Sequence, residues 1–498
     1  MGNLLENILI NYRWIFVCFF LLPLSTIYNV WFYARNWLIF KLGSAPKQHN
    51  LRVRDIQRQV KEWRAAGGKT PMCTGRPGWL TMSLRLGQYK KKLHQIYLPL
   101  MDVLDIDTSR QIVRVEPLVT MGQLSATLLS QGWTLPVVPE LDDLTVGGLI
   151  NGTGVETSSH IYGLFQHICV SYELILSDGS VVTCTKDNEP DLFYSVPWAH
   201  GTLGFLLSAE IRIIPAKKFV HLQYTPTYTL DDFIKKFTYE STRKDPHQFV
   251  EALAFGPDRS VLMVADMTDQ PDPKKINKIG HYYKPWFYKH VETFLRKGPS
   301  EEYIPLQDYF HRHTRSLFWQ LQYIIPFGNN QLFRYFLGWL MPPKVSLLKL
   351  TQGETIRKLY EEHQFIQDLM IPLNSLKEAI GVLHDTVKIY PIWLCPFLLH
   401  ADPGMVHPQQ DSGQMYVDVG LYGEPQVMGY QAARDTRKME AYCRKTGGFQ
   451  MLYADSYMTK DEFCEMFDHQ LYDKMREQLN CKSAFPHVYD KVGRKTLL

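Results

Sequence analysis

Glycine is concentrated in segment 139–154, which reads Pro-Glu-Leu-Asp-Asp-Leu-Thr-Val-Gly-Gly-Leu-Ile-Asn-Gly-Thr-Gly. Glycine has no Cβ, so its backbone can approach a ligand closely, and it also permits positive φ. Successive exposed amides in such a turn form an anion cradle suited to a diphosphate. A P-loop would need a lysine after its glycines, and a Rossmann fingerprint would need a third glycine after Gly152 and Gly154. The segment therefore predicts a diphosphate cradle of another kind.

The elements that would position this cradle are predicted on both sides of it. Residues 111–116, Gln-Ile-Val-Arg-Val-Glu, include three β-branched apolar residues and predict a strand, and a helix is expected after it at 121–131. Residues 173–184 predict two strands joined by an Asp-Gly turn. Another strand is expected at 207–214, where a proline ends it.

This order of elements resembles the flavin domain of the vanillyl-alcohol oxidase and p-cresol methylhydroxylase (PCMH) family. The chain is similar more closely to one branch of that family, the Δ24-sterol reductases (24-dehydrocholesterol reductase and its plant relatives). The resemblance extends from about residue 14 to near the C-terminus. The blocks that carry it are residues 73–79, 139–154, 160–167 and 390–396.

The resemblance implies an α+β fold with one N-terminal transmembrane helix. Residues 40–216 would form the two-part PCMH-type FAD-binding domain. Residues 217–498 would form a substrate-binding or cap domain, whose antiparallel sheet covers the isoalloxazine. Within this second domain, the pattern predicts strands at 221–224, 249–267 and 416–420 and loops or insertions at 274–299 and 402–413.

The resemblance also implies an FAD-dependent oxidoreductase that reduces the Δ24 double bond of sterol side chains with NADPH, in sterol and cholesterol biosynthesis. Residues 74–78 correspond to the family's second diphosphate loop, where many relatives carry a histidine bonded to the flavin. This chain has Arg76 and Trp79 in that region, which favours non-covalent FAD. Gly201, Leu203 and Gly204 are expected near the adenine and ribose. The residues expected to bind the diphosphate and its surroundings are Thr145, Val146, Gly147, Gly148, Leu149, Ile150, Asn151, Gly152, Thr153, Gly154, Val155, Glu156 and Thr157.

Reduction of an isolated alkene needs a proton donor, because hydride does not attack an unpolarised double bond. A proton at C24 leaves positive charge at C25, which then accepts hydride. Side chains do not carry hydride, so a cofactor is required. The sequence does not assign the donor, and the catalytic residues remain unknown at this point. The candidates in the second domain are Tyr422, Glu424, Tyr453, Asp455, Tyr457 and His400.

Two other functions remain open. One is an oxidase of the same fold that acts on a phenol, sugar or hydroxy acid with oxygen. The missing flavin-linking histidine and the apolar N-terminal segment argue against it. The other is a non-catalytic protein that retains the fold, and the intact glycine segments argue against that function.

Residues 14–34 carry no formal charge and are numerous enough to cross a hydrocarbon core. A cleaved signal peptide is the alternative, but the apolar run is long for one. We expect a single-pass protein of the endoplasmic reticulum membrane, with the Golgi membrane as a second location. Residues 1–13 would be lumenal and the body cytosolic, because basic residues are concentrated after the segment. These are Arg35, Lys41, Lys47, Arg52 and Arg54.

Segment 317–350 is rich in aromatic residues but is interrupted by Pro326 and Arg334, so a second span is not expected. It predicts either core helix or a membrane-apposed flap. Downstream of the anchor, residues 52–66 predict a helix that ends at two glycines.

Composition limits the other functions. The chain has 498 residues, which is enough for two or three domains, and its net charge of +4 gives no argument for nucleic-acid binding. The eight cysteines have no Cys-x-x-Cys spacing, which argues against structural zinc and favours reduced thiols. No metal site is expected, and the oligomeric state is left open. Residues 90–92, all lysine, predict either a solvated loop or contact with lipid or a cofactor phosphate.

Overall fold

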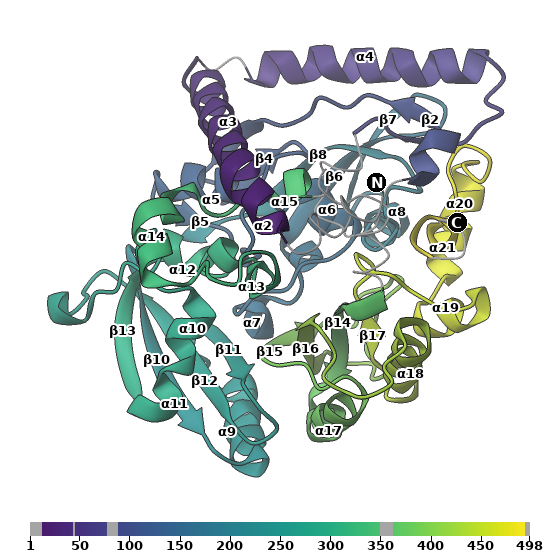
Figure 1. Cartoon of the computed structure of the whole chain (residues 1–498). Helices are drawn as coiled ribbons and strands as arrows, with labels where there is room; N and C mark the ends of the chain where they lie inside the picture. Colours follow the sequence, from purple (N-terminus) through teal and green to yellow (C-terminus); the bar gives the residue numbers. More distant parts are fainter. Residues whose placement is uncertain (1–11, 43–44, 77–87, 349–361, 494–498) are drawn as a thin grey trace, which may run out of the picture.

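The structure is a computed structural model that describes residues 12–42, 45–76, 88–348 and 362–493. Two antiparallel sheets, one of five strands and one of eight, form its framework, and helices pack against them (Figure 1). The predicted α+β fold is confirmed.

The five-stranded sheet lies in the first half of the chain, in the order β3-β4-β8-β6-β7. Its strands are β3 (Val103–Asp107), β4 (Ile112–Val115), β6 (Cys169–Ile175), β7 (Val181–Thr185) and β8 (Phe205–Arg212). The predicted hairpin is β6–β7, and Gly179 in its turn has a φ of 84°, which favours glycine. The predicted helix is α5 (Met121–Leu129). Thr120 caps its N-terminus, because the Thr120 hydroxyl accepts a hydrogen bond from the N–H of Gln123.

Other elements complete this half of the molecule. The helix predicted over 52–66 begins earlier, as α4 (Ala45–Ala65), and is followed as expected by Gly67 and Gly68, both with positive φ. Smaller elements are β1 (Met72–Thr74), β2 (His94–Ile96), β5 (Trp133–Thr134), α6 (Val146–Asn151), α7 (Ser159–Tyr162), α8 (Pro190–Ser195) and β9 (Ile214–Pro215).

The eight-stranded sheet has the order β13-β10-β12-β11-β15-β16-β14-β17. The single strand predicted over 249–267 is wrong: two antiparallel strands, β11 and β12, occupy this stretch with a turn between them. The strands are β10 (Phe219–Thr227), β11 (Phe249–Ala254), β12 (Ser260–Thr268), β13 (Ser300–Pro305), β14 (Phe365–Pro372), β15 (Ile392–Leu399), β16 (Gln414–Gly423) and β17 (Phe449–Gln450).

The two faces of this sheet have different partners. Helices α9 (Leu230–Thr242) and α17 (Leu376–Thr386) cover one face and form a core with alternate residues of the strands, such as Leu369, Leu394 and Val419. The residues between these, such as Trp393 and Cys395, face the first half of the chain. Because both faces are covered, all of β11 is buried.

Segment 274–299 is more ordered than predicted. It contains α10 (Phe287–Glu292) and α11 (Phe294–Lys297), and Phe294 stacks on Tyr224 of β10 with ring centroids 4.0 Å apart. The expectation of a loop there was therefore wrong, whereas 402–413 is a loop as predicted. Helix α12 (Leu306–Phe310) follows β13.

Segment 317–350 is neither a span nor one core helix. It contains α13 (Leu321–Ile324), α14 (Gln331–Leu337), η7 (Gly338–Leu340) and α15 (Val345–Leu348), and residues 349 and 350 lie outside the described residues. Among the described residues of this segment, five large apolar side chains are exposed: Phe327, Leu332, Tyr335, Phe336 and Trp339.

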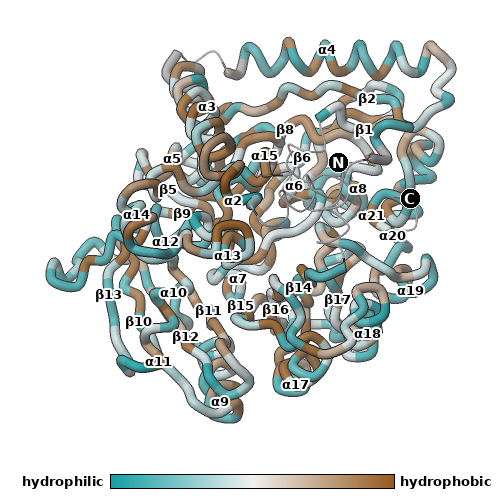
Figure 2. Tube along the Cα trace, in the orientation of Figure 1, coloured by the Kyte–Doolittle hydropathy of each residue, from teal (hydrophilic) through white to brown (hydrophobic). Residues whose placement is uncertain are grey.

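The N-terminal helix consists of α2 (Arg13–Phe16), the π-helical turn η1 (Val17–Leu21) and α3 (Leu22–Leu42). Its part Arg13–Arg35 is long and apolar enough to cross a membrane. Arg13 donates a hydrogen bond to the carbonyl of Leu348 at 3.2 Å, and Arg35 forms an ion pair with Asp102 at 3.0 Å. Both ends thus contact the body, along which the apolar helix lies (Figures 1 and 2).

The C-terminal helices return to the first half of the chain. They are α18 (Ala432–Lys445), α19 (Lys460–Met466), α20 (Gln470–Gln478) and α21 (Val488–Val492). Arg476 of α20 donates to the carbonyl of Thr202 at 3.0 Å, and the N–H of Met72 donates to the carbonyl of Ala484. The domain boundary between residues 216 and 217 stays a prediction.

A buried ion-pair network connects the two halves. The guanidinium of Arg312 donates to Glu156, which follows the glycine segment, at 3.0 Å, and to Glu251 of β11 at 2.8 and 2.9 Å. The three side chains have almost no exposed surface. Burial alone would raise the pKa of Glu251, but Arg312 and His313 hold it well below its ordinary value.

Replacement of this cation tests the importance of the network. Arg312→Met should destabilise the protein by about 3–5 kcal/mol, because two buried carboxylates lose their partner. Thermal and urea unfolding of the detergent-solubilised protein would measure the loss. Arg58→Met is the matched control, because Arg58 pairs with Asp55 and Glu62 in solvent, and it should leave the midpoint unchanged. Equal midpoints for both variants would contradict the prediction.

Candidate functional site

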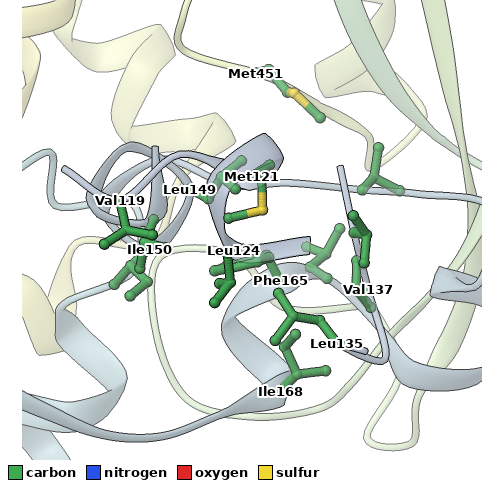
Figure 3. Close-up of a cluster of buried hydrophobic side chains, with 14 of the residues drawn as sticks. Val119, Met121, Leu124, Leu135, Val137, Leu149, Ile150, Phe165, Ile168 and Met451 are labelled. Carbon is green, nitrogen blue, oxygen red and sulfur yellow. The ribbon is translucent and has the colours of Figure 1, made fainter. Parts of the chain in front are cut away.

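The middle of the glycine segment, Val146–Asn151, forms the short helix α6, and the residues on both sides of it are irregular. Thr145 has an extended backbone and precedes α6, and the buried side chains Leu149 and Ile150 fix the helix to the core. Figure 3 shows both of them beside Val119 and Leu124. The opposite side of α6 is thereby free to face a cavity.

None of Gly147, Gly148, Gly152 and Gly154 has a positive φ. The role of these glycines is therefore to let neighbouring atoms come close to the backbone, not to permit an unusual backbone conformation. A Cβ on Gly147 would lie 2.6 Å from the Cβ of Pro117, so core packing requires this glycine. Gly154 is similarly enclosed by Pro139 and Leu149. Gly148 differs, because a Cβ there would meet only the hydroxyl of Thr145, at 3.1 Å, and would extend into the cavity.

The cavity has a volume of about 560 Å³ and lies between α6 and the eight-stranded sheet. Most of the predicted cofactor-binding residues line it: Thr145, Gly147, Gly148, Leu149, Asn151, Gly152, Thr153, Gly154 and Val155. The other four do not. Val146 and Ile150 lie in the core, Glu156 binds Arg312, and Thr157 contacts the hydroxyl of Tyr309.

Basic side chains line the same cavity. They are Arg13, Arg76, Lys90 and Lys491. The ammonium of Lys90 donates to the carbonyl of Thr74 at 3.1 Å and to that of Arg76 at 2.6 Å, and it thereby holds the first part of the predicted second diphosphate loop. Burial lowers the pKa of Lys90 to about 8. Residues 77–79 lie outside the described residues.

These residues fit the diphosphate of FAD. The backbone of α6 is accessible at Gly148, and basic side chains lie around the same space to balance negative charge. Gly201 and Gly204 also line the cavity, as the adenine-side prediction requires, whereas Leu203 is buried away from it.

The opposite wall carries two aspartates that were not among the predicted residues. Asp368 on β14 pairs in register with Gly420, and Asp418 on β16 pairs with Met370. The two carboxyl groups are therefore diagonal neighbours on the cavity face of the sheet. A Cβ on Gly420 would lie 2.5 Å from the hydroxyl of Tyr422, so this glycine leaves room for Tyr422 to donate its hydrogen bond to Asp368.

Burial determines the protonation of these carboxyl groups. It raises the pKa of Asp368 to about 7, against the opposing effect of the hydrogen bonds from Tyr422 and Tyr453. It also raises the pKa of Asp418 well above its ordinary value, and the charges of Asp368 and Glu140 raise it further. No described residue donates a hydrogen bond to either oxygen of Asp418.

The proton-donor candidates from the sequence separate into two groups. Tyr422 and Tyr453 line the cavity beside Asp368. Glu424, Asp455, Tyr457 and His400 do not line it. His400 packs edge-on against His167 instead, with ring centroids 4.6 Å apart. The missed aspartates did leave a signal, since each is an isolated carboxylate within an apolar strand, where aspartate is depleted.

Aromatic rings adjoin the aspartates. Phe318 lies with its ring centroid 4.9 Å from that of Tyr422 and 5.3 Å from that of Trp393. The indole N–H of Trp393 donates to Glu251 at 2.9 Å, which fixes its ring in the wall. This part of the cavity therefore combines an apolar, aromatic surface with buried carboxyl groups.

Comparisons with known proteins agree with this geometry. Residues 74–185 match the FAD binding domain family, and this range includes α6. The chain is similar to the Delta(24)-sterol reductases of Homo sapiens and Rattus norvegicus, at 59% and 60% identity, over 98% of this chain and 95% of each relative. L-gulonolactone oxidase of Bos taurus is only 21% identical over 78% of this chain. The chain belongs to the Delta(24)-sterol reductase family.

Proposed function

We propose that the cavity binds FAD without a covalent bond, with its diphosphate against residues 145–157, and a sterol side chain against the eight-stranded sheet. The protein is an FAD-dependent oxidoreductase that reduces the Δ24 double bond of sterols with NADPH. One observation carries the proposal: a single cavity joins the basic, glycine-containing wall to an apolar wall with buried carboxyl groups.

The first wall provides cofactor binding. Backbone near Gly148 approaches the diphosphate, and Lys90 and Arg76 offset its charge. FAD, once reduced by NADPH, supplies hydride. Non-covalent binding follows from Arg76 in the loop where many relatives of the wider flavin family carry a histidine.

The second wall provides the conditions for alkene protonation. Trp393, Phe318 and Tyr422 form an apolar surface that excludes water from the side chain of the sterol. Aromatic faces stabilise nearby positive charge, which develops at C25 when C24 takes a proton. An oxidase of the same fold would not need a buried acid at this place. The oxidase compared with this chain, L-gulonolactone oxidase, is only distantly similar to it.

Membrane attachment follows from the N-terminal helix and the surface beside it. We propose that residues 14–34 anchor the protein in the endoplasmic reticulum membrane, with the body on the cytosolic side. The exposed side chains Leu332, Tyr335, Phe336 and Trp339 form a surface that we call the α14 patch. The helix packs on η7 next to this patch, so we propose that the patch contacts the same bilayer.

Gly148→Val tests the cofactor site. The new side chain would occupy the space near the diphosphate, so the purified variant should retain less than about a tenth of the wild-type flavin, a loss of more than 1.4 kcal/mol. The absorption spectrum measures the flavin content. Gly381→Val is the matched control, because Gly381 is also helical, at a site with open space outside the cavity, and it should retain flavin. Normal flavin in Gly148→Val would place the diphosphate elsewhere.

Isotope incorporation tests the reaction. A Δ24 sterol reduced without oxygen, in heavy water and with unlabelled NADPH, should gain deuterium at C24, because a solvent-exchangeable acid supplies that hydrogen. Mass spectrometry and NMR of the product would locate it. A product without solvent-derived hydrogen at C24 would contradict protonation of the alkene, and failure of NADPH to bleach the flavin would contradict the reductase function.

Vesicle binding tests the α14 patch. Removal of residues 1–35 should weaken binding to phosphatidylcholine–phosphatidylserine vesicles without abolishing it. Leu332→Ser with Phe336→Ser should weaken the truncated chain further, by about tenfold for each side chain, since each buries apolar surface in the bilayer. Tyr239→Ser with Met428→Ser, which changes exposed residues outside the patch, is the control. Co-sedimentation measures binding, and equal binding of both double variants would exclude the patch.

A further inference from the structure

Asp418 is a buried carboxylic acid that the packing of the protein does not explain. Its side chain has no exposed surface, it faces the cavity, and no described residue bonds to either oxygen. A buried polar group without a partner costs free energy. Such a group is retained where it contacts a ligand or reacts with one.

We propose that Asp418 is the proton donor to C24 of the sterol alkene, and that Asp368 is the positioning residue that keeps Asp418 protonated. This inference rests on the proposed function, since it requires a Δ24 sterol in the cavity.

The hydrogen bonds distinguish Asp418 from its neighbours. Asp368 already accepts bonds from Tyr422 and Tyr453. The hydroxyl hydrogen of Tyr422 is directed at Asp368, so it is not available to a substrate. Glu140, which also lines the cavity, is bonded to Glu156. Asp418 is the member of this group whose proton no described residue holds.

The surroundings of Asp418 favour its protonated form. The groups that affect it, besides burial, are Asp368 and Glu140, and both are carboxyls. Neither Lys90 nor Arg76 is among the groups that shift the pKa of Asp418, and Lys90 donates to the carbonyls of Thr74 and Arg76. Two carboxylates this near cannot both ionise at little cost, so Asp368 favours the acid form of Asp418.

The aromatic wall favours the product of protonation. Phe318, Trp393 and Tyr422 lie on the same side of the cavity as Asp418, and their faces stabilise a cation. The C24–C25 π bond breaks, C24 takes the proton of Asp418, and C25 takes the hydride and its two electrons from the reduced flavin. Asp418 is left as a carboxylate, which takes up a proton from solvent before the next turnover.

Separate half-reactions test the assignment. Asp418→Asn should leave anaerobic reduction of the flavin by NADPH within about twofold of wild type, because no alkene is involved. Re-oxidation of the reduced flavin by desmosterol should slow by about 10²–10⁴-fold, the usual contribution of a general acid. Stopped-flow absorption measures both rates. The control is Glu440→Gln, which changes a buried carboxyl of raised pKa outside the cavity and should affect neither rate.

The possible outcomes distinguish a failure of the Asp418 assignment from a failure of the proposed reductase function. A wild-type protein that does not reduce desmosterol contradicts the function itself. A wild-type protein that reduces it, with an Asp418→Asn variant equally fast, overturns the assignment alone. If the variant retains no flavin, infrared difference spectra of the wild type test the assignment instead. Loss of a protonated-carboxyl band during one turnover supports the assignment, and the absence of such a band before turnover overturns it.

Asp368 has a separate test in the pH profile. The groups that face it are Tyr422, Tyr453 and Asp418, and Glu140 acts on Asp418 and Tyr453. Removal of its negative charge in Asp368→Asn lowers the pKa of Asp418, so the rate of sterol reduction should fall at a lower pH than in the wild type. A purely structural role would lower the rate at all pH values without moving this limb, and an unmoved limb would exclude the positioning role.

Discussion

The buried guanidinium of Arg312 connects the parts of the molecule that must act together. It bonds to Glu156, directly after the glycine segment, and to Glu251 of the eight-stranded sheet. Glu251 in turn accepts the indole N–H of Trp393, a cavity-wall residue. A cation without exposed surface requires well-placed anions, so the geometry of these bonds restricts the separation of the two walls.

The walls differ because their charges have different partners. On the cofactor side, the ammonium of Lys90 donates to the carbonyls of Thr74 and Arg76 and to the hydroxyl of Thr74, so it holds a loop and places a positive charge beside the cavity. On the sheet side, Asp368 and Asp418 have tyrosines and each other as neighbours. Burial raises the pKa values of both carboxyl groups. The same cavity can therefore bind an anionic cofactor at one wall and hold a neutral acid, Asp418, at the other, a combination that alkene reduction needs.

Local signals in the sequence predicted local structure well. The Asp-Gly turn and the two glycines after α4 each specify a turn or a helix end through nearby residues alone. The glycine segment was predicted to bind a ligand, which stays a prediction, and the form of residues 146–151 as α6 depends on Pro117 and the core. Asp368 and Asp418 were missed because their proximity arises from pairing between strands about fifty residues apart, which no local pattern encodes. The division of 249–267 into two strands was missed although Gly256, Pro257 and Asp258, which lie between β11 and β12, are typical of a turn.

The anchor helix is linked to the cavity by specific bonds. The hydroxyl of Ser25 accepts from the main-chain N–H of Lys344 at 2.9 Å, and the ammonium of Lys344 forms an ion pair with Asp143 of the cavity wall. Arg13, at the start of the same helix, lines the cavity itself. A helix bonded in this way cannot move far from the body, so a membrane that holds it, as we propose, would lie close to the cavity. A sterol dissolved in that membrane would then reach the cavity without crossing water, which favours an apolar substrate over any soluble competitor.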